Sequence, residues 1–154
     1  AGQDCEGLDD AHLAELWARH TSFARASCSR PNPAAEHVAV EQRVKAAAEH
    51  KAEGNMRFVA QEYTAARRAY TRAIDELHAV LEEEELASEQ RELLAVCLAN
   101  RAECNLKLGQ AAAALDDCRY ADGVARRQRM TALIAKIEDR AARARVAGAG
   151  RAAG

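Results

Sequence analysis

The residue types that could bind a metal or form disulfides are scattered along this chain. Its five cysteines form no CxxC pair, and none of its five histidines lies four residues from another. Zinc sites and disulfide frameworks need such side chains at short, regular spacings, so we expect no metal, no cofactor and no disulfide scaffold. The cysteines are instead expected to be small buried hydrophobic side chains in a reducing compartment, either the cytoplasm or an organelle matrix or stroma. They are Cys5, Cys28, Cys97, Cys104 and Cys118.

Catalytic groupings are also missing from the sequence. It contains no arrangement of nucleophile, base and acid and no glycine-rich phosphate loop. Asp116 and Asp117 form an acidic pair, but they fall on a short predicted surface helix, where such pairs are usually solvated. We therefore expect a protein that is not an enzyme and has no catalytic residue.

Helices are the elements that the composition predicts for this chain. Aromatic residues make up only 4% of the 154 residues, alanine supplies much of the apolar share, and both prolines precede residue 34. Because alanine has the highest helix propensity and lets helices pack closely, the composition predicts a soluble, all-α, one-domain protein. The longest apolar run, "LLAVCLA", is far shorter than the roughly 20 residues that cross a bilayer, so we expect no membrane span.

Charge is unevenly distributed, although the formal net charge is only −2. Acids dominate residues 75–92 and bases dominate residues 122–154. The arginines of the second segment are spread around a predicted helix, without interleaved aromatic residues that could stack on bases. We therefore expect a solvated helix face there and no nucleic-acid binding.

Helix start and stop signals divide the chain into four regions. Residues 1–30 predict an N-terminal helical extension, which ends at the prolines of "CSRPNP". Residues 33–121 predict a long first helix and two helical hairpins. The glycine of "ADG" (121–123) is interpreted as a helix stop, so a C-terminal capping helix is predicted over 122–147 and a flexible tail over 148–154.

Trp17 lies on the apolar face of the N-terminal extension, together with Leu13 and Leu16. Tryptophan is a frequent anchor of protein interfaces, so Trp17 is a candidate contact with another protein. Packing against its own domain, or folding back into a groove of that domain, is the alternative.

The two predicted hairpins repeat one pattern of small and aromatic residues. The first series is Gly54, Phe58, Tyr63, Ala66, Tyr70 and Ala73, and the second is Ala102, Leu106, Gly109, Ala111, Ala114, Cys118 and Ala121. Each series predicts a helix, a tight turn and a second, antiparallel helix. These residues resemble the tetratricopeptide repeat (TPR), over 51–121 only. The insertion "LEEEELASEQRELL" between them is similar to one in co-chaperones and large immunophilins.

The resemblance implies a short TPR solenoid of stacked hairpins with flanking capping helices, whose concave groove binds peptides or helices. In the co-chaperone TPR domains the groove looks like a carboxylate clamp for the acidic C-terminus of heat-shock chaperones. It uses Lys and Asn on the first helix of repeat one, Asn on that of repeat two, and Lys and Arg on that of repeat three. Lys51, Asn55 and Asn100 match the first three positions: Lys51 and Asn55 are four residues apart in "KAEGN", so they share one face of a helix, and Asn100 begins "NRAEC". An ammonium and two amides aimed at one point can bind a carboxylate, which accepts several charge-assisted hydrogen bonds. The alternative is that the amides serve packing and that Lys51 is simply exposed.

The match departs from the family at the third repeat. One period of about 34 residues after Asn100 lies Ile134, and one turn before it Met130, so the two cations are interpreted as replaced by apolar residues. Charge out of that register could come from Lys136 and Arg140 or from Arg126 and Arg127.

The sequence thus supports a non-enzymatic protein–protein interaction module. The first hypothesis is a co-chaperone-like adaptor that binds the acidic C-terminus of a heat-shock chaperone. The alternative is an accessory or scaffold subunit held within a larger multi-protein assembly, which the incomplete clamp and the unpaired terminal helices favour.

Overall fold

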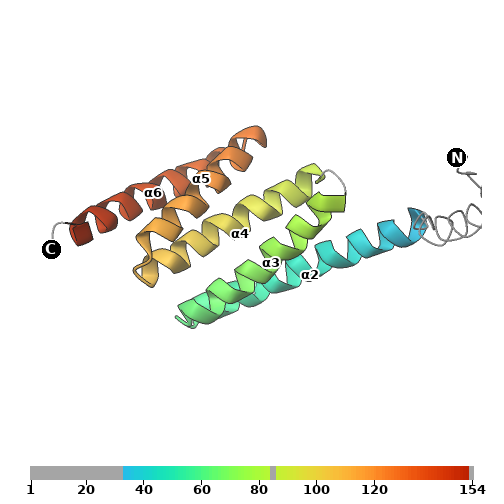
Figure 1. Ribbon diagram of the computed structural model, residues 1–154, viewed down its shortest axis with the longest axis horizontal. Helices are drawn as coiled ribbons and strands as arrows, with labels where there is room; N and C mark the ends of the chain where they lie inside the picture. Colours follow the sequence, from blue (N-terminus) through green and yellow to red (C-terminus); the bar gives the residue numbers. More distant parts are fainter. Residues whose placement is uncertain (1–32, 84–85, 153–154) are drawn as a thin grey trace, which may run out of the picture. The chain divides into compact units, whose positions relative to one another are not determined.

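The computed structural model describes residues 33–83 and 86–152, and within these ranges the chain is helical, without a strand. Its helices are α2 (Pro33–Val59), α3 (Tyr63–Glu83), α4 (Ser88–Lys107), α5 (Ala111–Arg127) and α6 (Thr131–Ala152) (Figure 1). The all-α prediction is therefore confirmed. The predicted N-terminal extension and its Trp17 lie outside the described residues. The chain divides after Glu36, and the contacts reported below belong to the compact unit from His37 onward.

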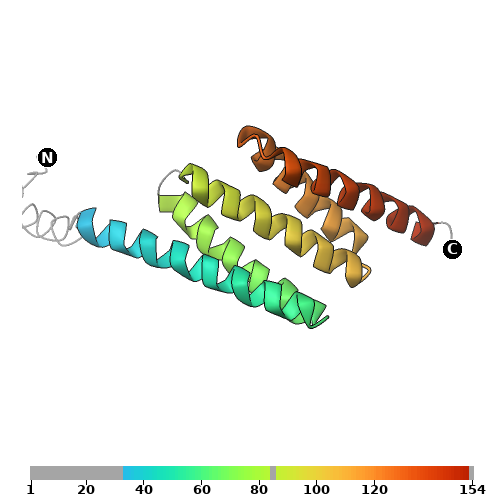
Figure 2. The ribbon, with the colours of Figure 1, turned by 180° about the vertical axis from the view of Figure 1, so that it is seen from behind.

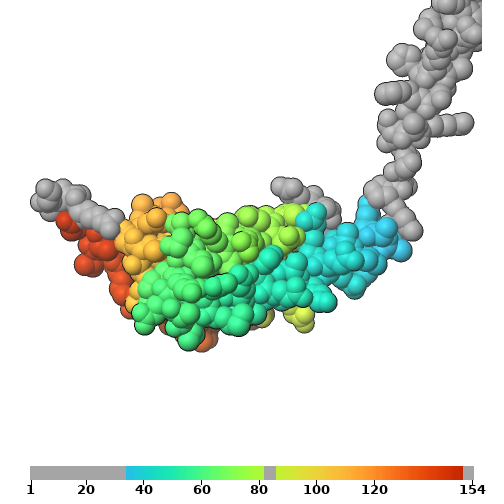
Figure 3. All heavy atoms as spheres, turned by 90° about the horizontal axis from the view of Figure 1, so that it is seen from below, coloured from blue at the N-terminus to red at the C-terminus, as the bar shows by residue number. Residues whose placement is uncertain are grey.

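Each helix of this unit runs antiparallel to the one before it (Figures 1 and 2). α3 packs on α4, α4 on α5 and α5 on α6, and α4 also contacts α6. The α2–α3 turn (green) and the start of α5 (orange) lie at the same end of the unit as the last turns of α6 (red) (Figure 3). The two predicted hairpins are thus present as α2–α3 and α4–α5.

Three turns end their helices in the same way. One residue in each adopts a positive φ: Gln61 (62°), Gly109 (71°) and Arg129 (56°). The next amide then donates to the carbonyl five residues back, at 2.9 Å, 2.7 Å and 3.0 Å respectively. This is the bonding of a Schellman motif, which satisfies carbonyls that the helix leaves unpaired. Only one of the three turns uses glycine.

The predicted helix stop at 121–123 is wrong, and so is the boundary that depended on it. Gly123 lies within α5, which continues to Arg127, and α6 begins at Thr131. A glycine inside a helix costs only about 1 kcal/mol, and buried alanines on either side of it, Ala121 and Ala125, pack into the core. The tail predicted to be flexible is also helical as far as Ala152.

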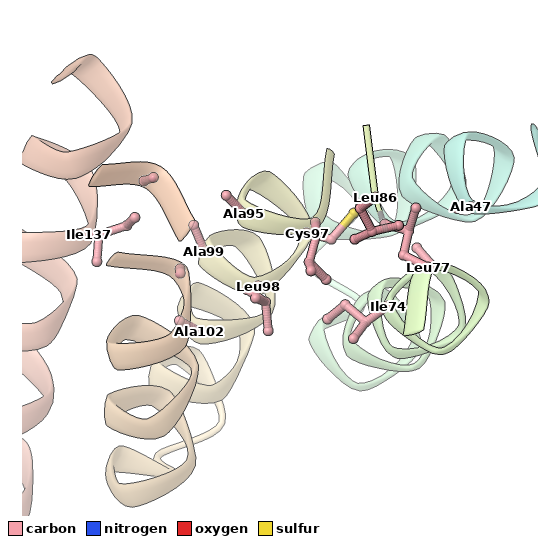
Figure 4. Packing of buried hydrophobic residues seen from close by; sticks show 14 of the residues in the cluster. Ala47, Ile74, Leu77, Leu86, Ala95, Cys97, Leu98, Ala99, Ala102 and Ile137 are labelled. Carbon is pink, nitrogen blue, oxygen red and sulfur yellow. The ribbon is translucent and has the colours of Figure 1, made fainter. Parts of the chain in front are cut away.

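The core contains many small side chains, mainly alanine, as the composition predicts. Ala99 of α4 and Ile137 of α6 lie on facing helices, while Leu77 of α3 lies beside Leu86 (Figure 4). Alanines that are fully buried let these helices approach closely. They include Ala47, Ala66, Ala73, Ala95, Ala99, Ala102, Ala114, Ala121 and Ala125.

A buried ion pair links the two helices of the second hairpin. Asp117 of α5 is only 7% exposed and accepts two hydrogen bonds from Arg101 of α4, at 3.0 Å and 2.6 Å. Asn105 adds a third bond to the same carboxylate at 2.9 Å, and Arg101 also reaches the Thr71 hydroxyl of α3 at 3.2 Å. The expectation that both acids of this pair are solvated holds for the exposed Asp116 and is wrong for Asp117.

Candidate functional site

A cavity of about 830 Å³ opens between α2, α4 and α6, with Tyr70 of α3 in its wall; we call it the groove. Phe58 and Val59, on the last turn of α2, form its apolar part, and Asn55 and Asn100 contribute two amides. Its charged side chains all come from α4 and α6 and leave an excess of two positive charges. They are Glu103, Lys107, Lys136, Asp139, Arg140 and Arg143.

The two candidate asparagines meet inside the groove. The Tyr70 hydroxyl donates to Oδ1 of Asn55 at 2.7 Å, and Nδ2 of Asn100 donates to the same oxygen at 3.4 Å. Burial raises the pKa of Tyr70 to about 12, so its hydroxyl stays a neutral donor at physiological pH. Because the oxygen of Asn55 is engaged, its amide hydrogens are the part left to bind an acceptor.

Gly54 makes this arrangement sterically feasible. A Cβ at position 54 would lie 2.7 Å from the Tyr70 ring, which is closer than side-chain carbons can approach. The absence of a side chain therefore lets α3 bring Tyr70 against α2. The repeat pattern singled out both residues as packing positions, but the sequence did not indicate that the Tyr70 hydroxyl would orient Asn55.

Lys51, the third candidate, is half-buried one turn before Asn55 and is not among the residues that line the groove. Burial raises the pKa of the Cys97 thiol to about 12, and the positive charge of Lys51 opposes that rise. Lys51 is therefore near Cys97 of α4. The structure brings two of the three candidate residues together and leaves the third outside the groove lining.

The cations on α6 differ from those expected from a simple 34-residue period. Met130 and Ile134 pack against the hydrophobic core, whereas Lys136 and Arg140, one helical turn apart, line the groove. The residues one repeat period after Asn100 are thus apolar, as the sequence indicated, and the cations that line the groove are Lys136 and Arg140, which lie outside that register.

Glu103 was not predicted as a site residue, yet it lies at the centre of the groove's charges. Arg140 donates to its carboxylate at 3.1 Å, and Arg143 donates through two nitrogens, at 3.1 Å and 2.5 Å. Burial raises the pKa of Glu103, but the bonds and charges of both arginines outweigh this, so the pKa lies below its usual range. Asn100, Glu103 and Lys107 recur at three and four residues, a spacing that could have indicated a shared face.

Other chemistry has little support in the described part of the chain. Its three cysteines, Cys97, Cys104 and Cys118, are free and buried, as expected, and Cys5 and Cys28 lie outside it. Between residues 33 and 152, leaving out 84–85, no three His, Cys, Asp or Glu side chains are grouped to hold a metal ion. No helix in those ranges combines the length and apolar character needed to cross a membrane.

Comparisons with protein-family models, with curated proteins and with solved structures found no match to this chain.

Proposed function

We propose that this chain is a TPR-like interaction module that binds the acidic C-terminus of a partner protein, such as a heat-shock chaperone, in the groove. The observation that carries the proposal is the meeting of Asn55 and Asn100 with Lys136 and Arg140 in one cavity. With Lys51 nearby on α2, α6 supplies the lysine and arginine that the resemblance implies for a third repeat. Four of the five clamp side chains thus line the groove, and the fifth, Lys51, lies one helical turn before Asn55.

The chemistry of the groove supports an occupant that is acidic and partly apolar. Lysine, arginine and asparagine all donate hydrogen bonds to carboxylate oxygens, and bonds to charged groups contribute roughly 1.5–3 kcal/mol each. Phe58 and Val59 offer apolar contact at one end, and Val59 is 83% exposed. A peptide that ends in two acids around a small apolar residue would satisfy both parts.

The test is binding of a fluorescently labelled peptide that ends in Glu-Glu-Val-Asp to the full chain, followed by anisotropy. We expect saturable binding that weakens in Lys136→Ala and in Asn55→Ala, and with a peptide whose C-terminus is amidated. Lys45→Ala is the matched control, because Lys45 is exposed on α2 and lies outside the groove lining. Absence of binding at millimolar protein, or equal loss in Lys45→Ala, would reject the proposal.

A scaffold role is the second candidate, favoured by exposed apolar side chains on the last turns of α2. Met56 is 68% exposed and Val59 83% exposed, three residues apart on one face. Such a pair can contact a permanent partner subunit. Affinity purification from the native extract tests this role: co-purification of a stoichiometric set of subunits, lost in Met56→Asp, is expected, and recovery of the chain alone would contradict it.

A further inference from the structure

We propose that Glu103 is an internal competitor for the groove's acidic occupant and thereby sets its binding strength. This inference rests on the proposed function of the same groove. It concerns a residue that the clamp pattern does not include. In this view the carboxylate of Glu103 occupies the guanidinium donors of Arg140 and Arg143, and an incoming carboxylate must compete for them.

The geometry of Glu103 is that of a bound carboxylate ligand. Its side chain is only 13% exposed, and its two oxygens accept a bidentate pair of bonds from Arg143 and a further bond from Arg140. Bidentate arginine–carboxylate pairs are among the strongest hydrogen-bonded ion pairs in proteins. The arginine donors that a peptide carboxylate would bind are therefore already bound to a carboxylate of the chain itself.

The remaining donors of the two arginines are also partly used. Arg140 donates to the backbone oxygen of Ala99 at 2.9 Å, and Nε of Arg143 bonds Asp139 at 3.0 Å. Two arginines and two acids therefore form a cluster without net charge. The excess positive charge of the groove belongs to Lys107 and Lys136, which have no hydrogen-bond or ion-pair partner among residues 33–83 and 86–152.

This division of charge has a consequence for recognition. A lysine is a point charge, whereas arginine offers a planar fork that matches a carboxylate. With Glu103 in place, an acidic peptide is held mainly by the two lysines and the asparagine amides, so its binding is modest and sensitive to salt. Neutralising Glu103 would free the guanidinium donors of Arg140 and Arg143 to bind the peptide. It would also remove from the groove a negative charge that repels an acidic peptide.

The experiment compares the wild-type chain with Glu103→Gln, using the Glu-Glu-Val-Asp peptide and the anisotropy assay. Glutamine keeps the size of the side chain and loses its charge. Because the released guanidinium can form an added charge-assisted hydrogen bond with the peptide, we expect about tenfold tighter binding or more. Glu92→Gln is the matched control, since Glu92 is exposed on the same helix outside the groove lining, and its affinity should stay close to that of the wild type.

A structural role for Glu103 alone makes a different prediction. Glu103 joins α4 to α6, so Glu103→Gln will also lower the unfolding temperature, which circular dichroism measures. A purely structural residue would lose stability and leave affinity unchanged or weaker, whereas a competitor gains affinity despite lower stability. If Glu103→Gln fails to fold, Glu103→Asp carries the test, because the shorter side chain cannot span both arginines and should still tighten binding by a smaller factor.

The outcomes separate this inference from the proposed function. Tighter binding in Glu103→Gln, with no gain in Glu92→Gln, supports the competitor. Two results overturn the inference and leave the proposed function standing. In the first, the wild type binds the peptide and Glu103→Gln binds it equally well or more weakly. In the second, Glu92→Gln gains as much affinity as Glu103→Gln. Failure of the peptide to bind any of the folded variants overturns both.

Discussion

The two hairpins share a pattern of small residues, but they join their helices by different means. In α2–α3, the Tyr70 ring lies against Gly54, and the rings of Phe58 and Tyr63 meet edge to face with centroids 5.4 Å apart. In α4–α5, Arg101 of one helix forms a two-bond ion pair with Asp117 of the other, and Cys118 stands at the position of Tyr70 in the repeat. The first interface is aromatic and the second is ionic.

This difference shows what a repeat of small residues determines. Small side chains fix how closely two helices approach, because a larger side chain would hold the backbones apart. They leave open which neighbouring groups complete the interface. An aromatic ring over a glycine and a buried carboxylate beside an arginine both satisfy that separation, with different sensitivities to substitution.

The largest effect is expected from breaking the ion pair of the second hairpin. Asp117→Ala leaves the guanidinium of Arg101, only 22% exposed, without its carboxylate. Removing one partner of a buried pair costs about 3–5 kcal/mol of the free energy of unfolding. Urea denaturation followed by circular dichroism measures this loss. Asp116→Ala is the control, because its exposed pair with Arg119 should contribute less than about 1 kcal/mol; equal effects of the two substitutions would show that Asp117 is not held as described.

The corresponding test of the first hairpin is Gly54→Ala. The added methyl would lie 2.7–2.9 Å from three carbons of the Tyr70 ring, so the ring or the helix must move. Overpacking of this kind typically costs about 1–3 kcal/mol of unfolding free energy. Gly123→Ala is a control of opposite sign, because no atom lies within 4 Å of a Cβ there and alanine favours α5 by up to about 1 kcal/mol. Urea denaturation measures both effects. Destabilisation by both substitutions would contradict the conclusion that Gly54 is needed for the close approach of Tyr70 and that Gly123 is not needed for packing.

Tyr70→Phe separates the ring of the first hairpin from its hydroxyl. It keeps the packing on Gly54 and removes the hydrogen bond to Asn55, which should cost about 1 kcal/mol of unfolding free energy. It also frees the Asn55 amide to turn, so peptide affinity should fall more than stability does. A Tyr70→Phe variant with unchanged affinity would show that the hydroxyl does not orient Asn55.

The pH dependence of stability gives a second measurement on the same variant. Burial raises the pKa of Tyr70 from 10.0 to about 12, so the folded chain holds this proton more tightly than the unfolded chain. The resulting stability is present below about pH 10 and is lost as pH rises toward 12. The wild type should therefore lose stability relative to Tyr70→Phe in that interval, measured by urea denaturation at each pH. Parallel curves would place Tyr70 in a solvated environment.

Sequence patterns predicted the helices and hairpins because hydrophobic spacing and helix propensity are local properties. Boundaries were less predictable: the sequence offered Gly123 as a stop, but the chain turns at Arg129, whose side chain gives no such signal. Part of the groove was predicted. Asn55 and Asn100 were found through the resemblance to the tetratricopeptide repeat, and Lys136 was named as one source of charge outside its register. Glu103 was missed, because its contacts depend on how α4 and α6 face each other, which no local pattern reveals.

The smallest expected effects concern the turns that close the two hairpins. Gln61 holds a left-handed conformation that costs an L-residue about 1–2 kcal/mol, while Gly109 adopts the same conformation at no steric cost. Gln61→Gly should therefore stabilise the chain by a fraction of that amount, because glycine also increases the entropy of the unfolded state. Gly109→Ala should destabilise it by about 1 kcal/mol, as alanine must accept the left-handed strain. Urea denaturation measures both changes in unfolding free energy. The expected signs would show that the turn of the first hairpin is strained and that the turn of the second is not. If Gln61→Gly destabilised the chain, the side chain of Gln61 would be contributing more than its backbone conformation costs.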